Sequence, residues 1–305
     1  MKISHLRLGV KAFIEDWILF PLSVIVHNVK ALVGFIILLF YIAMATIGPH
    51  VVPYPRSFTC PPYLPPTIFR WPPSLEHPLG CDYIGTDIWA QIVWGSTTVL
   101  EIAFIAGIVT TLVGIAVGMI AGFLGGKVDA VLMAITDVVM TIPGLPLLIV
   151  LASVIRTSSP LVVGLMLSIT AWAGLARAIR SQVLSLKYRE FVEAAKALGM
   201  PTWHIVFREI MPNLMSFVAI NFIFATVGAI YGSVGLYFLG VLPFTAFNWG
   251  IMLNMAFRQA GALYSLHTIH YLLAPIFAII GLQIGLILFS YAIDEIFNPR
   301  LRARA

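Results

Sequence analysis

Residues 102–126 read Ile-Ala-Phe-Ile-Ala-Gly-Ile-Val-Thr-Thr-Leu-Val-Gly-Ile-Ala-Val-Gly-Met-Ile-Ala-Gly-Phe-Leu-Gly-Gly, with no charged side chain between Glu101 and Lys127. A helix needs about 20 mostly apolar residues to cross the hydrocarbon core of a bilayer. The composition of the whole chain agrees with a membrane location, because 60% of its 305 residues are hydrophobic and only 10% are charged. Soluble proteins carry roughly 25% charged residues. The sequence therefore predicts an all-α membrane protein.

Other apolar intervals predict the remaining membrane spans. The uncharged interval between Glu209 and Arg258 is longer than one helix needs, which leaves room for a re-entrant or interfacial piece. The first apolar segment has no small-residue cleavage site, so we interpret it as an anchor and not as a removable signal peptide. We predict six transmembrane helices, near residues 31–48, 98–124, 130–155, 160–180, 213–240 and 272–293.

The distribution of Lys and Arg predicts the orientation of these spans. If the N-terminus is cytoplasmic, fourteen of the 18 Lys and Arg residues lie inside and four lie outside. This positive-inside bias predicts that the 181–212 segment and the tail 294–305 are cytoplasmic and that residues 1–30 are cytoplasmic or interfacial, in a multi-pass protein of the cell membrane. The net charge of +5 then reflects topology and contact with membrane lipid, and it does not indicate nucleic acid. The inside residues are Lys2, Arg7, Lys11, Lys30, Lys127, Arg177, Arg180, Lys187, Arg189, Lys196, Arg208, Arg300, Arg302 and Arg304, and the outside residues are Arg56, Arg70, Arg156 and Arg258.

The longest predicted outside loop, residues 49–97, is rich in proline. Ten of the 19 prolines fall between Pro49 and Pro78, which favours extended and turn-rich backbone. Both cysteines of the chain, Cys60 and Cys81, also lie in this loop. A disulfide between them would close a loop of about 20 residues and contribute roughly 3 kcal/mol. Two unpaired cysteines in a folded loop are an equally open interpretation.

A search for catalytic and metal-binding motifs finds none that is complete. Gly125-Gly-Lys127 is followed by Val128 and lacks the spacing of a phosphate-binding loop. His267 and His270 have no visible third metal ligand. Asp137, the acid deepest in a predicted span, is a proton site, an interfacial carboxylate or a carboxylate hydrogen-bonded between helices. We therefore expect no catalytic residue, no metal site and no bound cofactor in this chain.

Two features of the spans bear on helix packing. Gly114, Gly118 and Gly122 repeat every four residues, a pattern typical of close helix contacts in lipid. These contacts lie within the chain or with a partner, and we favour the first. The segment Pro143-Gly-Leu-Pro146 is predicted to kink or interrupt the third span, and interrupted helices can line transport pathways.

The 181–212 segment is charged and rich in helix-forming residues, although it lies between two apolar spans. We predict a helix over Ser185–Leu198 that Gly199 ends in a left-handed conformation, and a second amphipathic helix near 202–210 that ends before Pro212. Ala194 and Ala195 would form a flat patch. From composition alone, docking into a groove of another protein and lying on the lipid surface are equally open.

This segment resembles the EAA loop of ABC importer permeases, in which Glu-Ala-Ala-x-x-x-Gly leads to Ile-x-Pro. Here the two motifs are Glu193-Ala-Ala-Lys-Ala-Leu-Gly199 and Ile210-Met-Pro212. Residues 30–303 as a whole resemble the C-type permease subunit of dipeptide and oligopeptide importers. Further matches are Pro78-Leu-Gly-Cys-Asp82, Gly85-Thr-Asp87, Ala121-Gly-Phe-Leu-Gly-Gly126, Val128-Asp129, Asp137 with Ile142-Pro143, Trp249-Gly-Ile-Met-Leu253 and Asn298-Pro-Arg-Leu301.

The resemblance implies a permease core over 98–293 and a set of partner proteins. These are a homologous B-type permease, two ATP-binding subunits that carry ATP and Mg²⁺, and an extracytoplasmic solute-binding protein. Cys81 and Thr86 depart from the family pattern in the outer loop, where Thr and Arg are expected, and this puts substrate entry there in doubt. The residues implied to couple to the ATPase are Glu193, Ala194, Ala195, Gly199, Pro201, Thr202, Trp203, His204, Phe207 and Pro212.

The cargo and the energy source have alternatives. Relatives with this architecture also carry oligosaccharides, so the resemblance does not decide between peptides and sugars. A self-sufficient secondary transporter or channel would need intramembrane ion ligands, which this chain mostly lacks. An intramembrane enzyme is disfavoured by the missing nucleophile and metal motifs.

Overall fold

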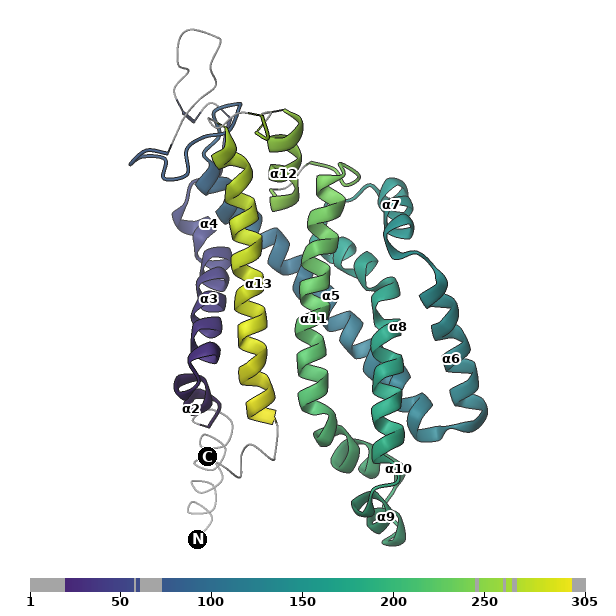
Figure 1. Ribbon diagram of the computed structural model, residues 1–305. Helices are drawn as coiled ribbons and strands as arrows, with labels where there is room; N and C mark the ends of the chain where they lie inside the picture. The colour runs from purple at the N-terminus through teal and green to yellow at the C-terminus, as the bar shows by residue number, and fades with distance from the viewer. Residues whose placement is uncertain are drawn as a thin grey trace.

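The computed structural model describes residues 20–57, 59–60, 73–244, 247–259, 262–264 and 268–297. The motif at 298–301, His267 and residues 1–19 of the predicted N-terminal segment lie outside this part of the chain. All regular elements in the described part are helical, which confirms the all-α fold class (Figure 1). They are α2 Phe20–His27, α3 Val29–Thr46, α4 Gly48–Val51, α5 Ile88–Leu124, α6 Gly126–Thr141, α7 Gly144–Ile155, α8 Pro160–Leu186, α9 Glu190–Ala197, α10 Thr202–His204, the π-helix η2 Ile205–Ile210, α11 Met211–Phe238, α12 Trp249–Arg258 and α13 Ile269–Phe297.

Five of the described helical stretches are long and apolar enough to cross a membrane, and a bent pair supplies a sixth. The pair is α6 and α7, which meet at an angle of 79°. The bend falls at Ile142 and Pro143, whose extended backbone ends one helix before the next begins at Gly144. Proline lacks the N–H that a continuous helix would need here. The predicted interruption of the third span is confirmed, and the uncharged interval after Glu209 supplies α12 in addition to α11.

Helices α5 and α8 pack along one another through the predicted glycine ladder. A Cβ atom added to Gly118 would lie 2.5 Å from the carbonyl oxygen of Ala176, and one added to Gly122 would lie 2.8 Å from Cβ of Val183. Gly114 faces Leu175 in the same way. The interpretation of this ladder as packing within the chain is therefore correct.

Two span boundaries were predicted wrongly. Helix α5 begins at Ile88, ten residues before the predicted 98, so the outer loop is shorter than 49–97. The side chain of Asp87 caps α5 by accepting a hydrogen bond from the Ala90 N–H. Gln91 and Ser96 make this region appear loop-like in sequence, but both are buried within the fold. Helix α8 likewise continues past residue 180 to Leu186.

Helix α8 forms ion pairs with two acids of α6. Arg177 forms an ion pair with Asp137, and Arg180 forms one with Asp129. Asp137 on α6 is therefore paired with a side chain of α8, which supports a carboxylate bonded between helices over a proton site. The two pairs fix the orientation of α6 relative to α8, one of them in the first turn of α6 and the other in its second half.

The turn before α5 is organised by a buried carboxylate. Oδ1 of Asp82 accepts hydrogen bonds from the N–H groups of Ile84 and Thr86 at 3.0 and 2.8 Å, and Oδ2 accepts one from Nε2 of Gln91 at 2.7 Å. Burial raises the pKa of Asp82, and the hydrogen bonds from Thr86, Ile84 and Gln91 oppose that rise. Desolvation therefore outweighs the hydrogen bonds to the charged form.

We expect the stability of this turn to depend on pH through Asp82. Because the folded-state pKa lies above the unfolded value, the stabilisation is complete below the unfolded pKa of about 3.9 and is lost as pH rises through the folded-state pKa. Asp82→Asn keeps the acceptor for Ile84 and Thr86 and should abolish this pH dependence. Asp82→Ala leaves the buried N–H of Thr86 without its acceptor, at about 1–3 kcal/mol. It also removes one acceptor each from the Ile84 N–H and from Nε2 of Gln91, which keeps its contact with the Thr86 carbonyl. Thermal unfolding in detergent at several pH values measures both effects, and an unchanged pH profile in Asp82→Asn would contradict this assignment.

Candidate coupling segment and cavity

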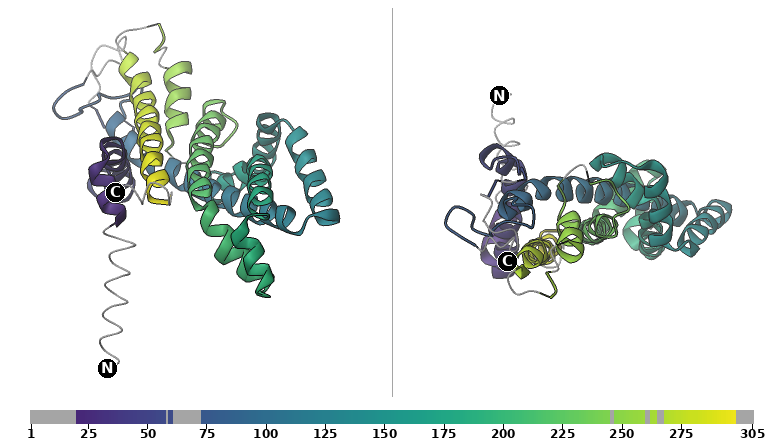
Figure 2. Two further views of the ribbon diagram at one scale, coloured as in Figure 1. Left: turned by 60° about the horizontal axis from the view of Figure 1, so that its bottom comes forward. Right: turned by 90° about the horizontal axis from the view of Figure 1, so that it is seen from above.

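The segment between α8 and α11 lies at one end of the bundle, here called the α9 end, opposite α12 (Figures 1 and 2). It does not begin with the continuous helix predicted over Ser185–Leu198. Helix α8 stops at Leu186, and α9 starts at Glu190. Nζ of Lys187 donates a hydrogen bond of 2.6 Å to the carbonyl oxygen of Phe123 at the end of α5, which anchors the turn between the two helices.

Helix α9 ends at Gly199 as predicted. Gly199 has a φ of +70°, a conformation that glycine adopts without the clash of a Cβ atom. The N–H of Met200 donates to the Ala195 carbonyl at 3.1 Å, and the N–H of Gly199 donates to that of Lys196 at 2.9 Å. This pair of bonds is the Schellman arrangement, which satisfies the last carbonyls of α9 and turns the chain sharply.

The second predicted helix does not end before Pro212. Helix α10 continues through η2 into α11, so that Thr202–Phe238 forms one stretch of 37 helical residues. Pro212 lies in the first turn of α11, where its missing N–H is tolerated. The preceding π-helical turn includes a bond from the N–H of Met211 to the carbonyl of Val206. The coupling segment is thus continuous with a membrane span.

One face of the coupling segment is buried against the bundle. Val192 on α9 and Ile205 and Ile210 on η2 pack in a single cluster with Ile179 of α8 and Leu214 of α11. Ala195 belongs to this buried cluster as well, with only 7% of its surface exposed. The predicted flat patch of Ala194 and Ala195 is therefore wrong, because only Ala194 is exposed. Neighbouring residues of a helix point in different directions, and the motif alone does not show which one faces inward.

The other face of the segment presents large apolar side chains. Trp203 and Phe207 are each 61% exposed, and Leu198 is 75% exposed. Tyr188 and Met200 are also exposed. These two residues and Leu198 are not among the predicted coupling residues, although their position beside Gly199 and the charged turn was a usable signal. Among the predicted coupling residues, Glu193, Gly199, Pro201, Thr202 and Pro212 are exposed, and His204 is half-buried.

Polar contacts fix parts of this surface. Glu193 pairs with Lys196 at 3.0 Å on the exposed side of α9. The His204 ring lies 5.8 Å from that of Trp203, edge to face, and Nε2 of His204 is 3.8 Å from Oε1 of Glu209. These contacts orient the segment, and the arrangement offers a recognition surface.

A cavity of about 490 Å³ opens between α5, α7, α8 and α11. Its lining has no charged side chain, and its polar groups include Thr110, Thr170 and Asn221. Gly144 and Leu145 line it too, directly after the break between α6 and α7. Helices α8 and α11, which hold the coupling segment, therefore also form walls of the cavity.

The fold defines a class of protein, a multi-pass α-helical membrane protein. Comparison with known families narrows the class, because residues 114–303 match the binding-protein-dependent transport system inner membrane component. The chain belongs to that family.

Curated relatives agree with the family. The chain is 32% identical over 233 residues to the dipeptide transport system permease protein of Bacillus subtilis, covering 74% of this chain and 69% of the relative. It is 32% identical over 228 residues to the oligopeptide transport system permease protein of the same organism, covering 74% and 72%. An oligopeptide transport system permease protein of Lactococcus lactis is 35% identical over 187 residues, covering 61% and 63%.

Proposed function

We propose that this chain is the permease subunit of an ATP-driven importer of peptides, and that α9, α10 and η2 dock on a separate ATP-binding subunit. The observation that carries the proposal is the geometry of the coupling segment. Its buried face is fixed to α8 and α11, while Leu198, Trp203 and Phe207 on its other side are exposed. Exposed aromatic anchors on a short helix are suited to a groove on a partner protein.

Motion of the docked subunit would reach the cavity through packed side chains. Ile179 and Val183 of α8 and Leu214 and Val218 of α11 belong to the same buried cluster as the inward-facing residues of the coupling segment. The same two helices line the cavity one to four turns further along, for example at Leu175. A packed core transmits displacement rather than absorbing it, so a shift of α9 and η2 moves the cavity walls. Alternating access of the cavity to the two sides of the membrane follows from that movement.

The charges support an orientation for the molecule. Eight described Lys and Arg residues lie on segments at the α9 end, and three lie on segments at the opposite end (Figure 1). The positive-inside rule then favours a cytoplasmic α9 end, where ATP is available. The α9-end residues are Lys30, Lys127, Arg177, Arg180, Lys187, Arg189, Lys196 and Arg208, and the others are Arg56, Arg156 and Arg258.

The remaining partners follow from the same architecture. A homologous B-type permease would complete the pathway whose wall α5, α7, α8 and α11 form here. Two ATP-binding subunits would hold ATP and Mg²⁺, and a solute-binding protein would deliver cargo at the α12 end. Peptides are favoured as cargo because the relatives are named for dipeptides and oligopeptides, and the uncharged lining with Thr and Asn groups suits a backbone of amides. Oligosaccharides are the alternative for the same cavity.

Uptake by the reconstituted complex tests the proposal. We expect proteoliposomes to accumulate labelled peptide only when ATP is present on the α9 side and the solute-binding protein on the other. Gly199→Asp should keep ATP hydrolysis but lose most uptake, because a Cβ at φ +70° disfavours the sharp turn after α9 by about 1 kcal/mol and shifts the docking face. Gly126→Asp is the matched control, since Gly126 also has a positive φ and open space around it, at the α5–α6 turn. Uptake driven by an ion gradient without ATP would contradict the proposal and favour a secondary transporter.

A further inference from the structure

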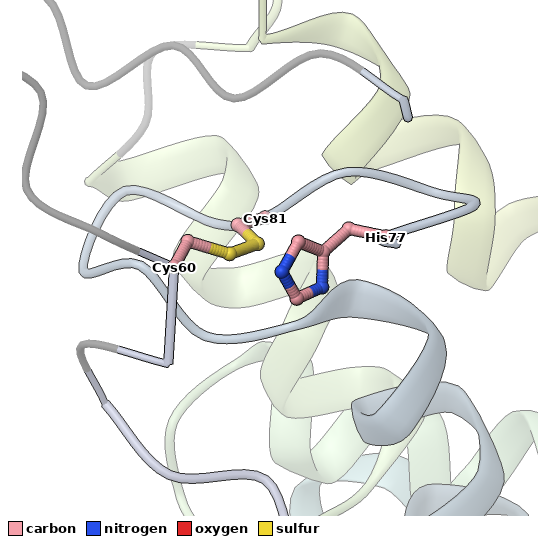
Figure 3. Close-up of side chains that lie close together, drawn as sticks. All are labelled: Cys60, His77 and Cys81. Carbon is pink, nitrogen blue, oxygen red and sulfur yellow. A yellow bond between two sulfur atoms is a disulfide. The ribbon is translucent and has the colours of Figure 1, made fainter. Parts of the chain in front are cut away.

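Cys60, His77 and Cys81 come together in the outer loop, at the turn that leads into α5 (Figure 3). The two sulfurs are joined in a disulfide. One ring nitrogen of His77 and both sulfurs lie within 4.8 Å of one another. Cys60 is 1% exposed and Cys81 is 4% exposed, so the cluster is shielded from solvent on the sulfur side.

The backbone holds these three residues in place independently of the disulfide. The N–H of Cys60 donates to the carbonyl of Gly85 at 3.0 Å, and the N–H of Gly80 donates to that of His77 at 2.8 Å. Cys81 forms an isolated bridge with Asp87. These backbone contacts involve no sulfur atom, so breaking the bond between the sulfurs does not itself remove them.

A carboxylate orients the imidazole toward the sulfurs. Nδ1 of His77 lies 2.6 Å from Oδ2 of Asp87, while Oδ1 of Asp87 caps α5 through the Ala90 N–H. The ring turns its other nitrogen, Nε2, toward the two sulfurs (Figure 3). A carboxylate that holds one imidazole nitrogen so that the other faces a ligand position is the usual second contact of histidines that bind zinc.

We propose that the reduced form of this loop binds one Zn²⁺ through Cys60 Sγ, Cys81 Sγ and His77 Nε2, with water as the fourth ligand. Two sulfurs and one imidazole suit Zn²⁺, whose bond lengths of about 2.3 Å to sulfur and 2.0 Å to nitrogen place tetrahedral ligands roughly 3.5–3.8 Å apart. The cluster as a whole lies within 4.8 Å, and the two sulfurs, which are bonded in the structure, move apart to that spacing after reduction. The same three residues thus hold the loop in two alternative ways, by a disulfide when oxidised and by a metal when reduced.

The exchange of the disulfide for bound Zn²⁺ begins with reduction. A thiol or phosphine reductant supplies two electrons, the bond between the sulfurs breaks, and each sulfur takes up one proton. Zn²⁺ then displaces the two thiol protons, so that metal binding to the thiols releases two protons, and neutral His77 donates its Nε2 lone pair. On reoxidation a small-molecule disulfide accepts the two electrons and two protons, the bond between the sulfurs re-forms, and the metal is released because disulfide sulfurs are no longer thiolate ligands.

Metal binding to the purified full chain in detergent tests the proposal without any transport assay. The protein is reduced with a phosphine, and Zn²⁺ is titrated against a chromophoric chelator. We expect one Zn²⁺ per reduced wild-type chain, none at this site in the oxidised chain, and none in Cys60→Ser/Cys81→Ser. His77→Ala keeps the disulfide available for folding and should bind at least tenfold more weakly. Asp87→Asn retains the α5 cap and should lose 10–100-fold in affinity.

Cobalt and a matched histidine variant complete the experiment. Co²⁺ in the reduced wild type should show a thiolate-to-metal charge-transfer band that the double cysteine variant lacks. His50→Ala, which removes an exposed histidine outside the cluster, should bind like wild type. A reduced wild type that binds no more Zn²⁺ than the double cysteine variant, or Co²⁺ without the thiolate band, would overturn the proposal and leave a disulfide as the sole crosslink of the loop.

Discussion

Replacement of both Trp203 and Phe207 by Ala is expected to abolish stable association with the ATP-binding subunit and, with it, uptake. The two rings are each 61% exposed on the coupling segment. An aromatic anchor at the centre of an interface contributes about 2 kcal/mol or more, and each 1.4 kcal/mol is a tenfold change in affinity. We therefore expect at least a 100-fold loss of affinity, measured by binding of the ATP-binding subunit to permease in nanodiscs.

The folding of that variant should be unaffected, because neither ring is part of the buried cluster that holds the segment. Equal yield and thermal stability relative to wild type would show this. Phe277→Ala on α13 is the matched control, since that ring is similarly exposed at 64% but lies on a membrane span. Association at wild-type affinity in the double variant would remove the coupling segment as the docking site.

Replacement of Gly118 by Leu is expected to prevent folding of the permease. A Cβ added at this position would lie 2.5 Å from the carbonyl oxygen of Ala176 and 2.8 Å from Cβ of Ile179. Neither a backbone carbonyl nor a β-carbon can move without displacing α8, so α5 and α8 must separate. Overpacking of this kind costs about 1–3 kcal/mol even where side chains can adjust. Fluorescence-detected size-exclusion chromatography should show loss of the monodisperse peak.

A glycine on α8 provides the comparison for Gly118. A Cβ added to Gly174 meets nothing within 4 Å, so Gly174→Ala should keep the peak and gain up to about 1 kcal/mol of helix propensity. Gly118→Ala should give a yield between those of wild type and Gly118→Leu. If Gly118→Leu folds as well as wild type, the close contact of α5 and α8 is not what holds these spans together.

The spans were predictable because the bilayer imposes a length and excludes charge. Charge-free intervals therefore located α3, α8, α11 and α13, and most of their predicted ends lie within several residues of the observed ones. The start of α5 was not predictable in this way, since Gln91 and Ser96 are polar yet buried against the rest of the fold. Burial of a polar side chain depends on tertiary partners that no local pattern contains.

Local backbone chemistry separates what was predicted at the candidate site from what was missed. Gly199 was correctly expected to end α9, because the left-handed conformation is a property of glycine itself. Pro212 was wrongly expected to end a helix, since proline is also suited to the first turn of the next one. Ala195 was wrongly predicted to lie on the surface. It is buried in a cluster with residues of other elements, among them Ile205, and the sequence of α9 alone does not reveal such packing. The approach of His77 to Cys60 could not be predicted either, because it too depends on contacts between segments that are separate in sequence.

We propose that the coupling segment contacts the ATP-binding subunit. A photo-crosslinking amino acid placed at position 203, 207 or 154 of the permease in the assembled complex tests it most directly. Val154 is 76% exposed on α7, away from the α9 end, and serves as the control. We expect crosslinks to the ATP-binding subunit from positions 203 and 207 and none from position 154. Crosslinks from position 154 alone, or from none of the three in a complex that hydrolyses ATP, would contradict it.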